Sequence, residues 1–169
     1  MNTINGAVVD TSFWSLCCLT GLEPYLWVTW SVLFVPTIVQ QELFHRIRLV
    51  PQQQLFQQAL RTGHIQIQDP VTLISTLSKG ERAVVSLAQE QRIPALLDDY
   101  RPHQHAQNLG INVMSVAQFL IRLLYRGTLT VTEAEQHFQQ LQQTHATSPF
   151  FLQWAAQHIQ QKGGQVTWP

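Results

Sequence analysis

Acidic side chains stand where the sequence predicts that strands end. Asp10 follows the apolar run Ala7-Val8-Val9, and the pair Asp98-Asp99 follows Ala95-Leu96-Leu97. Ligands of an open parallel sheet bind beyond the carboxyl ends of its strands, so these carboxylates would converge. Like charges that lie close together are unfavourable unless one is protonated or a cation lies between them. We therefore expect a hard divalent cation with oxygen ligands, Mg²⁺ or Mn²⁺, at this edge.

Two glutamates are expected to reach the same edge. Glu42 lies in the first turns of a helix predicted after strand 32–35, and Glu81 lies in the first turn of a helix predicted before strand 95–97. Each acid also has an ordinary structural interpretation. Asp10 and Glu81 fit helix caps. Glu42 fits a solvated helix surface, and Asp98-Asp99 fits a turn. The hypothesis of one site depends on all of them meeting at one sheet edge.

Short apolar runs alternate with longer stretches of helical periodicity, a pattern typical of α/β architecture. Strands are expected at 7–9, 32–35, 65–68, 95–97 and 111–114, the third as an edge or half-buried strand. Capping-box spacing is found at Thr37 with Gln40, Ser78 with Glu81, Ser115 with Gln118 and Thr130 with Glu133. Asp69-Pro70 predicts a short helix to Leu77. The expected fold class is α/β, with one parallel sheet of about five strands covered on both faces.

Composition narrows the class of protein. Hydrophobic residues make up 45% of the 169 residues and charged residues 12%, which favours a compact globular chain. The net charge is zero, so a polyanion must be bound through a local patch or a bound cation. We expect no secretory signal, because no positive charge precedes an apolar core at residues 1–6, and no membrane span, because Pro36 interrupts the most apolar stretch. Adjacent Cys17 and Cys18 cannot form an ordinary disulfide and fit a reducing, cytoplasmic setting.

The order of the acidic motifs resembles that of the PIN-domain family, in particular its VapC-like ribonuclease and toxin branch. The matching segments are 8–12, 35–43, 77–83, 96–100, 109–113 and 122–127. No single motif is distinctive, and the resemblance rests on their order and spacing over most of the chain. It implies a single PIN-like three-layer α/β/α domain over 1–169, with C-terminal helices 130–162 packed on it.

The resemblance also implies site residues. The implied catalytic set is Asp10, Glu42, Glu81 and Asp99, and the implied metal ligands are Asp10, Asp99, Asp98 and Glu81. Of the acidic pair, Asp99 is favoured as the direct ligand and Asp98 as a supporting acid. The implied contacts to substrate are Thr11, Ser12, Lys79, Arg82 and Arg101. One departure is Tyr100, which stands at a position that is often basic in relatives, and basic residues are sparse throughout.

The implied activity is metal-dependent hydrolysis of RNA phosphodiester bonds, which leaves a 5′-phosphate and a 3′-hydroxyl. A bound Mg²⁺ or Mn²⁺ would orient a water, lower its pKa and neutralise charge on the phosphate. A toxin role would add an antitoxin protein in the acidic groove and a homodimer, with no membrane partner. The alternative is a PIN-like scaffold or regulatory binding module that does not hydrolyse RNA.

Other acid-bearing folds and metal sites fit less well. A phosphoacceptor receiver domain needs an acidic pair after its first strand and a lysine after its last, where this chain has only Asp10 and Ser115. A haloacid-dehalogenase-like phosphatase needs Asp-x-Asp, which Asp10-Thr11-Ser12 does not supply. A zinc site at His103 and His105 is disfavoured, because that spacing places the two on different sides of a helix. We expect the histidines to face solvent or cap helices.

Overall fold

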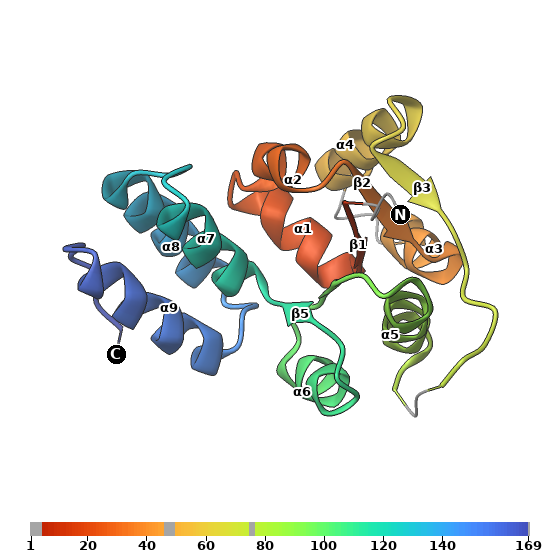
Figure 1. Ribbon diagram of the computed structural model, residues 1–169. Helices are drawn as coiled ribbons and strands as arrows, with labels where there is room; N and C mark the ends of the chain where they lie inside the picture. Colours follow the sequence, from red (N-terminus) through yellow and green to blue (C-terminus); the bar gives the residue numbers. More distant parts are fainter. Residues whose placement is uncertain (1–4, 46–49, 75–76, 169) are drawn as a thin grey trace.

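A computed structural model describes residues 5–45, 50–74 and 77–168 (Figure 1). Its centre is a five-stranded, all-parallel sheet in the order β3-β2-β1-β4-β5. The strands are β1 (Gly6–Val9), β2 (Val32–Val35), β3 (Ile65–Ile67), β4 (Ala95–Leu96) and β5 (Val113–Met114). The predicted parallel sheet is confirmed, and the strand predicted at 65–68 lies at an edge.

Helices link the strands and extend beyond them. Within the described ranges they are α1 (Thr11–Leu19), α2 (Glu23–Thr29), α3 (Thr37–His45), α4 (Val50–Arg61), α5 (Lys79–Gln91), α6 (Tyr100–Asn108), α7 (Val116–Tyr125), α8 (Val131–Thr144) and α9 (Pro149–Gln161). Figure 1 shows α1 and α2 on one side of the strands and α5 and α6 on the other. This follows from right-handed crossovers, since the chain runs outward from β1 to β3 and then returns to β4 and β5.

The sheet is covered on both faces, and strands β1 and β2 are apolar throughout. Every residue of β1 and β2 is buried, as expected when helices cover both faces of a parallel sheet. Helix α8 packs against α1 and α7, and α9 packs against α7 and α8. None of the described helices combines the length and the apolar character needed to cross a bilayer.

Helix α1 is firmly seated in this core. Phe13 and Trp14 are at most 1% exposed, and burial of each ring contributes roughly 1.5–3 kcal/mol. The indole Nε1 of Trp14 donates to the carbonyl oxygen of Gln52 in α4 at 3.0 Å. The Phe13 ring packs on Phe119 of α7, with the ring centroids 6.1 Å apart. The first turn of α1 is therefore a fixed platform for the side chains it carries.

Three of the four predicted capping boxes are confirmed, namely those of α5, α7 and α8. The box predicted for Thr37 with Gln40 is wrong. Thr37 is the first residue of α3, and its N–H and hydroxyl both donate to the Asp69 carboxylate at 2.7 Å. The cap of α3 thus comes from a residue 32 positions away in sequence.

The prediction of a short helix after Asp69 is also wrong, because the described residues 69–74 are not helical. Asp69 caps α3 instead of its own segment. The N–H groups of Val71 and Thr72 donate to the Glu90 carboxylate at 3.0 and 2.8 Å. These long-range bonds replace the intrahelical ones that a local pattern predicts.

Helix α6 begins at Tyr100, three residues earlier than the sequence indicated, and this changes the environment of His103. His103 was expected to face solvent or to cap a helix, but it is only 2% exposed. Its Nε2 shares a 2.9 Å hydrogen bond with Gln118 Oε1 of α7. Burial lowers the pKa of His103, while the bond to Gln118 opposes that shift. This histidine connects α6 to α7.

Replacing Asp69 with alanine tests the long-range cap. The change removes the acceptor for both Thr37 hydrogen bonds, so we expect the free energy of unfolding to fall by about 1 kcal/mol. Urea denaturation followed by circular dichroism measures this loss. Asp69→Asn keeps one acceptor oxygen and should lose less. Wild-type stability in Asp69→Ala would show that α3 does not depend on this carboxylate.

Candidate active site

A pocket of about 220 Å³ lies at the carboxyl edge of the sheet. The carboxylates that line it are Asp10, Glu42, Glu81 and Asp99. Asp10 directly follows β1, Glu42 lies in α3, Glu81 in the first turn of α5, and Asp99 just before α6. Thr11 and Ser12 line the same pocket. The structure therefore brings side chains from four separate elements around one cavity, as convergence at the ends of parallel strands requires.

Asp10 is both a helix cap and a wall of this pocket. It is 5% exposed, and its Oδ1 accepts the N–H of Phe13 at 2.7 Å at the start of α1. Burial raises the pKa of Asp10 well above its usual value, and the Phe13 hydrogen bond opposes the shift. The negative charges of Asp99, Asp98 and Glu81 raise the pKa further. A cation in the pocket would favour the ionised form of this carboxylate.

Glu42 reaches the pocket through a close approach between α3 and α5. The Thr11 hydroxyl donates toward Glu42 Oε2 at 3.3 Å and toward the Val39 carbonyl oxygen at 3.4 Å. A Cβ built on Gly80 would lie 2.7 Å from both carboxylate oxygens of Glu42. No side chain fits at that distance without displacing Glu42. Glycine at position 80 leaves the space that the carboxylate occupies.

The other two pocket carboxylates are also held by hydrogen bonds. Glu81 Oε2 accepts the N–H of Ser78 at 3.2 Å, which forms part of the capping box of α5. Asp99 is exposed, and the Ser12 hydroxyl donates to its Oδ2 at 3.5 Å. Thr11 and Ser12 thus each tie a carboxylate of another element to the first turn of α1. Their expected contact with metal or phosphate stays a prediction.

Asp98 is placed differently from Asp99. It is 2% exposed, does not line the pocket, and accepts the N–H of Val116 at 2.9 Å at the start of α7. Burial raises the pKa of Asp98 to about 6; the Val116 N–H and the nearby Thr147 hydroxyl lower it, and the charge of Asp99 raises it. Asp98 therefore faces the interior, and Asp99 is the member of the pair that reaches the cavity.

A larger groove of about 520 Å³ continues from the pocket and shares Ser78, Glu81 and Asp99 with it. Arg101 and His105 of α6 line this groove. Of the three basic residues predicted to contact phosphate, only Arg101 lines either cavity; Lys79 and Arg82 do not. His105 was not predicted, although its spacing of four residues from Arg101 places both on one helix face.

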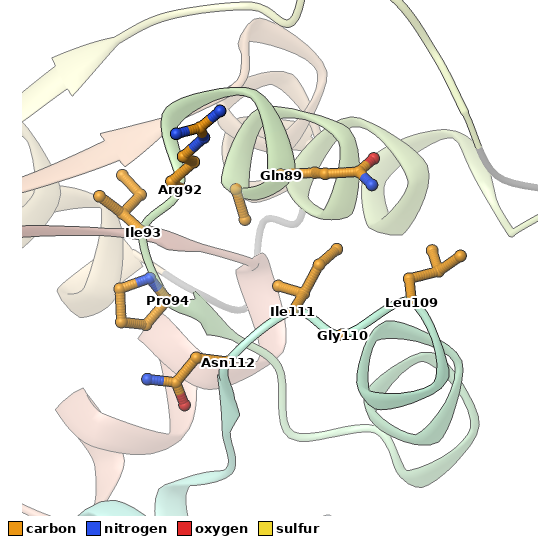
Figure 2. Close-up of a pocket in the computed structure, with 9 residues that line it drawn as sticks. Gln89, Arg92, Ile93, Pro94, Leu109, Gly110, Ile111 and Asn112 are labelled. Carbon is orange, nitrogen blue, oxygen red and sulfur yellow. The ribbon is translucent and has the colours of Figure 1, made fainter.

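A third pocket, of about 390 Å³, lies at the opposite edge of the sheet (Figure 2). Figure 2 shows Arg92 and Ile93 at the end of α5, and Ile111 and Asn112 leading into β5. No carboxylate lines this pocket. This pocket therefore lacks the oxygen-bearing acids that a hard cation prefers.

The carboxyl-edge pocket fits a cation that is bound partly through water. No three His, Cys, Asp or Glu side chains of the described residues are close enough to form a closed metal-binding group. Mg²⁺ usually takes only one or two carboxylates directly and keeps several waters. The buried Asp10 among like charges and the space left by Gly80 for Glu42 both suit such a cation. That Asp10 and Asp99 hold such a cation directly stays a prediction.

The chain belongs to the PIN-domain family, whose family model matches residues 8–152. The matched segment contains all four pocket carboxylates. Its fold is of the nuclease type, since PIN domains are generally nucleases that act on nucleic acid and commonly use divalent metals. No curated protein matches the chain. The family membership expected from the acidic motifs is confirmed, whereas the VapC-like branch stays a prediction.

Gly80→Ala tests whether Gly80 admits Glu42 to the site. We expect Mn²⁺ affinity, measured by titration calorimetry, to fall roughly tenfold, as when a supporting group of a metal site is disturbed. In a Glu42→Ala background the same change should have no further effect, because the displaced carboxylate is already absent. Equal losses in both backgrounds would show that Gly80 does not act through Glu42.

Asp98→Ala and Asp99→Ala form a matched pair. Asp98→Ala leaves the buried Val116 N–H without its acceptor, so we expect it to lower the free energy of unfolding by roughly 1–3 kcal/mol. Asp99→Ala should change stability by no more than about 0.5 kcal/mol, because Asp99 is exposed, and should weaken Mn²⁺ binding. Urea denaturation in EDTA and calorimetry measure the two effects. The reverse pattern would make Asp98 the direct ligand.

Proposed function

We propose that this protein is a metal-dependent endoribonuclease that hydrolyses RNA phosphodiester bonds with Mg²⁺ or Mn²⁺. The observation that carries the proposal is one pocket lined by Asp10, Glu42, Glu81 and Asp99, at the carboxyl edge of the parallel sheet of a PIN domain. Such a pocket combines anionic ligands for a hard cation with further carboxylates suited to proton transfer.

The pocket residues have different roles in the proposed reaction. Asp10 and Asp99 would hold a divalent cation, which would supply a lowered pKa of a bound water and charge to neutralise the phosphate. Glu42 or Glu81 accepts the proton of the attacking water, as a positioned carboxylate can. Thr11 holds Glu42, and the first turn of α1 directs the positive end of its dipole toward the same space. Arg101, in the adjoining groove, contacts a neighbouring phosphate.

The bound cation is needed for RNA binding as well as for hydrolysis, because the pocket itself is negatively charged. The net charge of the chain is zero, and four carboxylates face the pocket. Without a cation these charges repel a phosphodiester backbone. Lys79 and Arg82 line neither cavity and make at most peripheral contacts to RNA.

A toxin role is the finer form of the proposal. It would place a small antitoxin protein over the acidic pocket and pair two copies of the chain in the cytoplasm. Residues 1–169 would then act as one PIN-like domain, and the packing of α8 on α1 and α7 supports this. A short reading frame with a DNA-binding start beside the gene would favour the toxin role.

A non-hydrolysing scaffold or regulatory module is the second candidate. The scarcity of basic residues, ten in the chain, favours it, whereas the four converging carboxylates favour catalysis. Titration with Mn²⁺ separates the two, because a scaffold that has lost the chemistry should show no specific metal site.

Asp10→Asn tests the ribonuclease proposal. Asparagine can still cap α1, so the fold should persist, while the charge that binds the cation is lost. With Mg²⁺ or Mn²⁺ present, we expect cleavage of a panel of labelled RNAs to fall at least about 100-fold. EDTA should abolish wild-type cleavage, and the products should carry 5′-phosphates. If wild type and Asp10→Asn showed equal activity, or if wild type cleaved nothing, the proposal would fail.

A further inference from the structure

His105 is a half-buried histidine of α6 that lines the groove beside the acidic pocket. The groove has a volume of about 520 Å³ and shares Ser78, Glu81 and Asp99 with the pocket. Because the two cavities have these walls in common, a ligand that is held at the acidic pocket and is too large for it extends into the groove. The groove is therefore the surface that a substrate of the pocket contacts next.

The side chains of α6 that line the groove follow the acid in a fixed order. Asp99 is the N-cap residue of α6, Arg101 lies in its first turn, and His105 lies one turn later. That turn places His105 about 6 Å further along the helix axis than Arg101. Residues four apart share one face of a helix, which agrees with both side chains lining the groove. A carboxylate, a guanidinium and an imidazole thus succeed each other along α6.

The groove also has apolar walls. Leu77, just before α5, is half-buried, Pro102 of α6 is buried, and both line the groove. The groove has more than twice the volume of the acidic pocket, in the range of sites that hold small organic molecules. Apolar walls beside an imidazole suit a flat heterocycle, whereas phosphates are held mainly by basic side chains and N–H groups.

We propose that this groove binds the base of one unpaired RNA nucleotide, next to the phosphate that is cleaved, with the base stacked on His105. This inference rests on the proposed ribonuclease function and specifies the form of RNA that is cut. Histidine is among the side chains on which unpaired RNA bases stack. Stacking requires no positive charge, which suits a chain of zero net charge. Bases inside a duplex are covered by their neighbours, so they do not reach His105.

A nucleotide matches the groups of the two cavities. A nucleic-acid strand presents phosphates and bases in turn, and the acidic pocket with its cation takes the phosphate that is cleaved. In the groove, Arg101 takes a neighbouring phosphate, and His105 with the apolar walls takes the base. The nearest alternative is that His105 binds a second phosphate through its charge. Substitutions that keep either the ring or the charge of this side chain separate the two.

The test is cleavage of a single-stranded oligonucleotide by the full chain with Mn²⁺. His105→Ala should raise KM roughly 5- to 150-fold, the range for loss of one stacked base, with little change in kcat. His105→Phe keeps a ring and should keep KM near the wild-type value. His105→Lys keeps only the positive charge and should behave like His105→Ala. Urea denaturation should show that α6 persists in the alanine variant, because alanine has the highest helix propensity.

A matched control and a chemical probe separate stacking from a structural effect. Gln107 lies on the same helix but lines neither cavity, so Gln107→Ala should leave KM unchanged. A single abasic position moved along the oligonucleotide should raise the wild-type KM most at one nucleotide beside the cleaved bond. That increase should disappear in His105→Ala, because the ring that the base contacts is gone. Such non-additivity identifies a direct contact between the base and the side chain.

Each outcome decides between the two proposals. An unchanged KM in His105→Ala, or equal cleavage of duplex and single strand, would overturn the base site and leave the ribonuclease standing. Recovery of KM in His105→Lys but not in His105→Phe would assign the side chain to a phosphate and would also reject the base site. The same holds if the abasic position affected wild type and His105→Ala equally. Absence of cleavage by metal-loaded wild type would overturn both proposals.

Discussion

Repulsion between carboxylates is the constraint around which the carboxyl edge of this sheet is organised. Parallel strands deliver Asp10 and Asp99 to one edge, and α3 and α5 add Glu42 and Glu81. Burial and like charges raise the pKa of Asp10, so its ionised form is unfavourable in the metal-free protein. Hydrogen bonds from neighbouring N–H and hydroxyl groups offset part of this cost, and a divalent cation would offset the rest. A pocket in which like charges repel each other is therefore suited to binding a metal cation.

Two of the four pocket carboxylates, Asp10 and Glu81, also cap helices. Asp10 and Glu81 were each open to a plain capping interpretation, and both do cap a helix. A capping carboxylate accepts an N–H with one of its oxygens, and this bond fixes the direction of the whole group. The caps of α1 and α5 thus orient two charges toward one cavity. Capping and catalysis are compatible because helices that follow or precede parallel strands begin at the edge where ligands bind.

The sequence predicted those features that depend on neighbours along the chain. Apolar runs predicted the five parallel strands, and local capping boxes predicted where α5, α7 and α8 begin. Features that depend on distant partners were missed. The cap of α3 comes from Asp69, and the need for glycine at position 80 arises from Glu42, which lies on another helix. No local pattern carries such information, since only the folded chain brings those atoms together.

The balance of charge determines how this protein could attract a nucleic acid. A nucleic-acid enzyme usually gains affinity by neutralising phosphates with basic side chains, and that affinity is strongly salt-dependent. This chain has no net charge, and Arg101 is its only predicted phosphate contact that lines the site. On the proposed function, a bound cation supplies the attraction for one phosphate. Such a protein would bind weakly to nucleic acid at large, because it releases few counterions.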